Sequence, residues 1–116
     1  MSSSNLLFLS HILDSLRKVS TYLEGQSYSQ FLADEIRQDA VIRKLEVVGE
    51  ATKRVENQLR DRYSEVPWRA MAGMRDKLIH DYFNVDLEIV WETAKSEVPA
   101  LVKQIELICK ELEEKN

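Results

Sequence analysis

The stretch 74–82 combines a guanidinium, a carboxylate, an imidazole and a phenol, on Arg75, Asp76, His80 and Tyr82. Arginine carries a permanent charge and a fork of N–H donors that fits phosphate. Histidine exchanges a proton near neutral pH. RNA is cleaved without a metal when a base removes the 2′-hydroxyl proton, the oxygen attacks phosphorus, and an acid protonates the departing 5′-oxygen. Arg75 and His80 suit this chemistry.

A single ideal helix does not aim these groups at one point. At about 100° per residue, Arg75 and Tyr82 lie about 20° apart, whereas His80 lies about 140° from Arg75. They converge if the helix loosens near Asp81 or if this face packs against a second subunit. The reaction uses two proton-transfer groups, yet the only histidines are His11 and His80. A twofold dimer would bring two copies of His80 together, so the spacing indicates a groove or an interface.

A structural interpretation stays open, and residue types alone favour it. Arg75 could form an ion pair with Asp76 or Glu50, and His80 could interact with the terminal carbonyls of its helix. Tyr82 alone is more typical of a packing aromatic with a hydrated hydroxyl.

Other candidate groups have equally plain interpretations. We expect His11 to be a partly exposed helix residue with no role, and Trp68 and Trp91 to anchor a core or an interface. Asp76 and His80 are four residues apart, but no further ligands of suitable spacing support a metal site. Five basic residues could guide RNA, although a solvated charged face is the commoner arrangement: Lys53, Arg54, Arg60, Arg62 and Arg69.

The composition is that of one helix-rich domain covering residues 1–116. Hydrophobic residues make up 44% and charged residues 31%, while Gly (3) and Pro (2) are too scarce for many tight turns. The net charge is −4, which disfavours nonspecific coating of nucleic acid. Residues 43–77 nevertheless carry nine basic and six acidic side chains, and this allows a local anion site.

Cysteine usage and hydropathy indicate where the protein resides. Cys109 is the single cysteine, which excludes an intrachain disulfide framework and a cysteine-based zinc site. The longest apolar run near the N-terminus, residues 6–9, is far shorter than a membrane span. We therefore expect a cytoplasmic protein that does not engage membranes.

Hydrophobic spacing predicts an all-α antiparallel bundle of five to six helices. The first helix is expected from about Asn5 to Glu24, before Gly25. A short second helix through Phe31 and Leu32 begins at a capping box of Ser27 and Gln30. A long third helix is expected over roughly 36–62, where Gly49 would permit close approach of another helix.

The later helices are predicted from proline and capping residues. Pro67 suits the first turn of a fourth helix, from Trp68 to about Asp81. Residues 83–85 are expected to form a loop, and Asp86 to cap a fifth helix. Pro99 either kinks that helix or begins a sixth.

At these residues the chain resembles the HepT-like family of HEPN-domain proteins, the toxins of HepT/MntA-type toxin–antitoxin pairs. The family motif is Arg, four residues, His, one residue, Tyr, which Arg75, His80 and Tyr82 match. The resemblance covers most of the chain and includes the stretches 38–43, 45–51, 66–69, 72–76, 80–83 and 85–87. Asn84 stands where relatives often have Gly, and Asn also tolerates a left-handed backbone.

The resemblance implies a HEPN bundle that forms a homodimer with both motifs at a shared cleft. It implies a metal-independent endoribonuclease toxin of a type VII-like system, with no cofactor, in which Arg75 and His80 are catalytic and Asp76 orients one of them. The implied partner is a minimal nucleotidyltransferase antitoxin (MntA-like) that transfers AMP to Tyr82. An alternative is a non-catalytic module that binds a nucleotide or the nucleotidyltransferase, and a third is a purely structural dimerising bundle.

Overall fold

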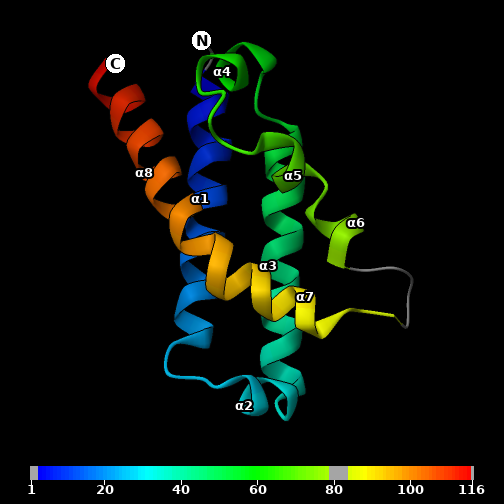
Figure 1. Cartoon of the computed structure of the whole chain (residues 1–116). Coiled ribbons are helices and arrows are strands. Elements are labelled where there is room, and N and C mark those ends of the chain that lie inside the picture. Colours follow the sequence, from blue (N-terminus) through cyan, green and yellow to red (C-terminus); the bar gives the residue numbers. More distant parts are fainter. Residues whose placement is uncertain (1–2, 79–83, 116) are drawn as a thin grey trace.

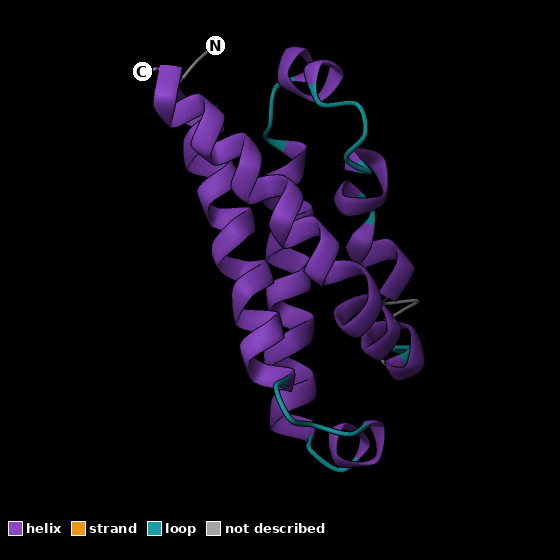
Figure 2. Cartoon of the chain, turned by 60° about the vertical axis from the view of Figure 1, so that its left-hand side comes forward, coloured by secondary structure: helices purple, strands orange, loops and turns teal. Residues whose placement is uncertain are grey.

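The computed structural model describes residues 3–78 and 84–115, and helices dominate this part of the chain. The helices are α1 (Ser3–Leu23), α2 (Tyr28–Leu32), α3 (Glu35–Lys53), α4 (Asn57–Arg62), α5 (Trp68–Ala72), α6 (Met74–Leu78), α7 (Leu87–Glu92), the π-helix η1 (Thr93–Glu97) and α8 (Val98–Lys115). These two stretches contain no β-strand (Figure 2). The all-α prediction is confirmed.

Two long antiparallel helices form the frame of the bundle. α1 descends from the N-terminus, and α3 returns alongside it after the short α2 at the far end (Figure 1). α8 packs across α1 and brings the C-terminus back to the end that holds the N-terminus. The smaller helices α5, α6 and α7 lie against α3.

The core is the meeting line of the apolar stripes of these helices. α1 contributes side chains that are at most 2% exposed, at the helical spacing its sequence shows: Leu9, Ile12, Leu16, Val19 and Leu23. They meet Val41, Leu45 and Val48 from α3, and Ile105 and Ile108 from α8. Full burial of one such side chain stabilises the fold by about 1.5–3 kcal/mol.

The turn between α1 and α3 is held by side-chain caps. Ser27 and Gln30 form the predicted capping box, with reciprocal hydrogen bonds of 2.8 and 3.1 Å. Gly25 has a φ of +74°, which glycine adopts without strain. Asp34 caps α3 by accepting from the backbone N–H of Arg37, and this hydrogen bond lowers the pKa of Asp34.

The prediction of one third helix over 36–62 is wrong, because tertiary hydrogen bonds end α3 at Lys53. Arg60 folds back and donates to the carbonyls of Thr52 and Val55, at 2.5 and 3.1 Å. Asn5 of α1 accepts from the backbone N–H of Glu56 and donates to its carboxylate, at 3.0 and 3.2 Å. These contacts come from residues 5 to 51 positions away, so a local apolar pattern does not contain them.

The predicted fourth helix is also divided, at Gly73, into α5 and α6. A Cβ at Gly49 would lie 3.4 Å from the carbonyl oxygens of Met71 and Ala72. The expected close approach of a helix to Gly49 is therefore confirmed. With the continuous run 87–115 counted once, the described residues form seven helical segments rather than five or six.

The last run begins at Asp86, which accepts from the backbone N–H of Ile89 at 3.1 Å, as predicted. η1 adds a wider turn just before Pro99, and the N–H of Val98 donates to the carbonyl of Thr93. Pro99 then falls in the first turn of α8, where its missing N–H costs least. The loop predicted at 83–85 lies only partly in the described residues.

No helix within residues 3–78 and 84–115 combines the length and apolar character of a membrane span.

Candidate functional site

The helix α6 carries the candidate residues that the structure describes. Arg75 and Asp76 are both exposed on this five-residue helix. The carboxylate of Asp76 forms no ion pair or hydrogen bond with the described residues. His80 and Tyr82 lie outside the described residues, and so does Asp81. The convergence of Arg75 with His80 therefore stays a prediction.

Arg75 is held from the side of α3. Its Nε lies 3.4 Å from Oε2 of Glu46, with the two side chains 55% and 26% exposed. Arg75 thus pairs with neither of the two predicted partners, Asp76 and Glu50. The contact uses Nε, and the Nη atoms make no ion pair or hydrogen bond within 3–78 and 84–115. Those atoms form the fork that binds phosphate.

The underside of α6 fixes the helix to the bundle. Met74 and Leu78 are both buried and anchor α6 on the core. The backbone N–H of Asp86 donates to the carbonyl of Leu78 at 3.1 Å. The described residues on either side of 79–83 are therefore hydrogen-bonded to each other.

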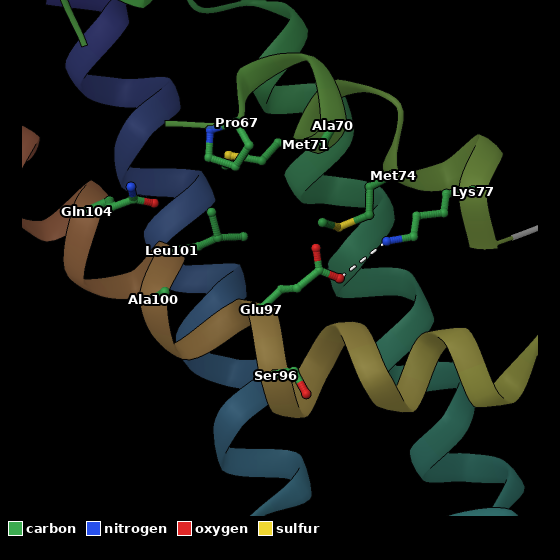
Figure 3. A pocket seen from close by; sticks show the side chains of 10 residues that line it. All are labelled: Pro67, Ala70, Met71, Met74, Lys77, Ser96, Glu97, Ala100, Leu101 and Gln104. Carbon is green, nitrogen blue, oxygen red and sulfur yellow. Dashed lines mark hydrogen bonds and ion pairs between the residues drawn. The ribbon is translucent and has the colours of Figure 1, made fainter. Parts of the chain in front are cut away.

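α6 also borders a pocket of about 290 Å³, to which it contributes Met74 and Lys77 (Figure 3). Met71 and Met74 form one wall and Leu101 another, and an ion pair of 3.2 Å between Lys77 and Glu97 spans one end. Gln104 lies at the other end. α6 therefore forms two ion pairs with neighbouring helices: Arg75 pairs with Glu46 of α3, and Lys77 pairs with Glu97 of η1.

The π-helix η1 lines the same pocket as α6. π-turns inside α-helices occur frequently at functional sites, and here the turn carries Ser96 and Glu97 on the pocket lining. At the start of η1, the hydroxyl of Thr93 is buried and has no hydrogen-bond partner among residues 3–78 and 84–115. A buried hydroxyl without a partner destabilises the fold.

The structure also places the secondary candidates. Trp68 is buried and its Nε1 donates to the carbonyl of Tyr63 at 2.9 Å, so it is a core anchor as predicted. Trp91 packs against Tyr28 and Phe31, with ring centroids 5.7 and 5.4 Å apart.

The five basic residues considered as RNA guides differ in their surroundings. Arg60 donates to the carbonyl of Thr52 near the end of α3, and Lys53 pairs with Glu50. Arg62 lies over the ring of Tyr63, whereas Arg54 and Arg69 are exposed. His11 is exposed on α1, as expected.

Neither cysteine chemistry nor a metal centre is evident in the described part. Burial raises the pKa of the Cys109 thiol, which lowers its reactivity. No group of three or more metal-ligating side chains gathers within residues 3–78 and 84–115.

Glu46 is the site residue that the sequence reasoning missed. It lies one turn before Glu50 on the same side of α3, so the helical period gives both residues nearly the same direction. Which turn of α3 faces Arg75 depends on how α6 docks. The position of Gly49, where α5 comes closest, was the available signal.

Residues 12–108 match the family described as HepT-like, ribonuclease HepT-like. This chain belongs to the HepT-like ribonuclease family, and the resemblance inferred from the motif is confirmed.

Relatives extend over nearly the whole chain. "Putative RNase MJ0125" of Methanocaldococcus jannaschii is 45% identical over 93% of this chain and 93% of its own. "Putative RNase TTE0752" of Caldanaerobacter subterraneus subsp. tengcongensis is 43% identical over 87% and 90%. "Probable ribonuclease HepT" of Thermococcus cleftensis is 39% identical over 95% and 100%. No solved structure matches the chain significantly.

Proposed function

We propose that this protein is an endoribonuclease toxin that cleaves RNA without a metal cofactor, at a cleft shared by two copies of the chain. The observation that carries the proposal is membership of the HepT-like ribonuclease family over residues 12–108. Exposure of Arg75, which carries the first position of the motif, supports it. The names of the relatives point to the same chemistry.

In this proposal Arg75 binds the scissile phosphate and stabilises the charge that builds on its oxygens. His80 of one copy takes the 2′-hydroxyl proton, and the oxygen displaces the 5′-oxygen from phosphorus to leave a cyclic phosphate. His80 of the second copy protonates the leaving oxygen. Asp76 orients one of these groups. The two-copy arrangement follows from the need for two proton-transfer groups in a chain with few histidines.

Regulation is proposed to act on Tyr82. A minimal nucleotidyltransferase would direct the phenol oxygen onto the α-phosphorus of ATP, so that the O–P bond forms, pyrophosphate leaves and the phenol proton passes to a base of that enzyme. The AMP group places negative charge and bulk in the motif, where an RNA phosphate must bind.

RNA cleavage in excess EDTA tests the activity, using protein made without an antitoxin and the His80→Ala variant in parallel. We expect cleavage by the wild type and its loss in the variant. Equal cleavage by both would remove His80 from the reaction. Intact RNA with a folded dimer, together with tight binding of a nucleotide or nucleotidyltransferase, would favour the binding-module alternative.

Mass mapping tests the regulation. We expect the mass of one AMP or more on the peptide that contains Tyr82 when the protein is made with its nucleotidyltransferase and ATP. A label on another residue, or no label, would contradict this mechanism.

A further inference from the structure

A furrow runs between α1 and α3, apart from the α6 pocket. It consists of two depressions of about 350 and 220 Å³ that share His11 and Val47 as lining residues. The first continues past Lys44, and the second continues past Arg43 and Arg54. α1 and α3 lie side by side along this line (Figures 1 and 2).

The charge of the furrow is positive although the chain is acidic. Its two carboxylates are already paired with lysines outside the lining: Asp14 with Lys18 at 3.1 Å and Glu50 with Lys53 at 3.5 Å. Three cations line the same furrow and form no ion pair or hydrogen bond through their side chains with the described residues: Arg43, Lys44 and Arg54. The furrow therefore presents three cations that the described residues leave unpaired, although Asp14 and Glu50 lie in the same lining.

Apolar and aromatic side chains lie among the polar residues that line the furrow. Phe8 lines the second depression and is half-buried, so part of its ring is accessible. Leu7 is 54% exposed and lines the first depression, together with polar residues such as Ser10. Cations beside an accessible aromatic ring suit single-stranded nucleic acid, because cations hold the phosphates and aromatic faces receive the bases.

The furrow shares helix α3 with the partner of Arg75. Arg43 lines the furrow, and Glu46, which contacts Arg75, lies three residues further along α3. Residues three apart on a helix have Cβ atoms about 5–6 Å apart. A strand held in the furrow would thus contact the same stretch of α3 that carries the partner of Arg75.

We propose that the α1–α3 furrow is the track that holds single-stranded RNA beside the cleavage site, with Arg43, Lys44 and Arg54 binding consecutive phosphates and Phe8 receiving a base. This inference rests on the proposed ribonuclease function, since it takes RNA as the ligand. It assigns RNA binding to α1 and α3, which carry none of the motif residues.

The test measures binding of a fluorescent 2′-O-methyl RNA of about 12 nucleotides, a length within the usual site size for single strands. This RNA lacks the nucleophile, so binding is separated from cleavage. The variant is Lys44→Gln/Arg54→Gln. Its matched control is Lys103→Gln/Lys110→Gln, which removes the same charge from exposed positions of α8.

We expect the furrow variant to bind at least about tenfold more weakly and to lose about 1.4 from the slope of log K against log salt, since each phosphate contact on a single strand contributes about 0.7. The α8 control should keep the wild-type slope. Equal slopes for the two variants, or no binding by the wild type, would overturn the proposal. Loss of a dimer in the furrow variant alone would also overturn it, because the furrow would then be an interface between copies.

Cleavage of ordinary RNA by the wild type is recorded separately. A wild type that binds through the furrow but never cleaves contradicts the proposed function and leaves the track standing. Cleavage with identical binding by both variants contradicts the track alone.

Discussion

Glu46 offers the sharpest test of how Arg75 is used. The carboxylate approaches Nε of Arg75 at 3.4 Å and directs the Nη fork elsewhere, while its charge competes with an RNA phosphate. Two substitutions separate these effects. Glu46→Gln keeps an oxygen for Nε but removes the charge, whereas Glu46→Ala removes both.

The expected size of these effects follows from the solvent exposure of the Arg75–Glu46 ion pair. With side chains 55% and 26% exposed, the pair belongs with surface ion pairs, which contribute about 0.2–1 kcal/mol. Removing the competing charge should therefore tighten RNA binding by Glu46→Gln by about 1.5- to 5-fold. Glu46→Ala should lower the single-turnover cleavage rate by about tenfold, because a misplaced catalytic group costs rate even when substrate binds.

The assay combines binding of 2′-O-methyl RNA with single-turnover cleavage of ordinary RNA. Glu113→Gln, an exposed charge on α8, is the matched control for net charge and should change neither quantity. In an Arg75→Gln background, both substitutions at Glu46 should lose their effect. Wild-type cleavage by Glu46→Ala, or weaker RNA binding by Glu46→Gln, would refute the positioning role of Glu46.

Three further predictions concern stability. Asn5→Ala should destabilise the fold by about 2–4 kcal/mol in urea unfolding, because it removes two part-buried hydrogen bonds to Glu56, one of them to the charged carboxylate; a loss below about 1 kcal/mol would contradict this bridge. Thr93→Val should stabilise by about 1 kcal/mol and raise Tm, since the buried Thr93 hydroxyl has no hydrogen-bond partner in the described part of the chain; a lower Tm would contradict this prediction. Burial and the Glu111 hydrogen bond raise the pKa of Tyr63, so its contribution is complete below pH 10 and is lost above it. Tyr63→Phe should therefore lose less stability between about pH 9 and 11 than the wild type, and equal losses would contradict this assignment.

Capping residues and the apolar period of the sequence are sufficient to predict much of the fold. Ser27, Gln30 and Asp86 act as the caps that their spacing predicts, because a cap needs only neighbours within three residues. The apolar period likewise identified α1 and the buried positions of α3. Gly49 was recognised as a point of close approach, although the sequence did not say which helix approaches.

The predicted helix boundaries that were wrong depend on side-chain hydrogen bonds that the apolar pattern does not record, one set of them from 51 residues away. α3 ends at Lys53 because Arg60 and Asn5 satisfy backbone groups there, while the apolar stripe continues through Val55 and Leu59. The apolar period indicates which residues are buried. It does not indicate where side chains replace the backbone hydrogen bonds of a helix. One uninterrupted pattern was therefore divided into two helices.

The amino-acid sequence by itself determined the all-α class, the principal core stripes and the motif of Arg75, His80 and Tyr82, since helical period and residue chemistry are local properties. Only the tertiary structure decided that Arg75 pairs with Glu46 and that α6 is also held by η1. It alone showed that the cations of α3 border a furrow with α1. These relations depend on how helices dock, and docking is set by the packing of side chains far apart in the chain.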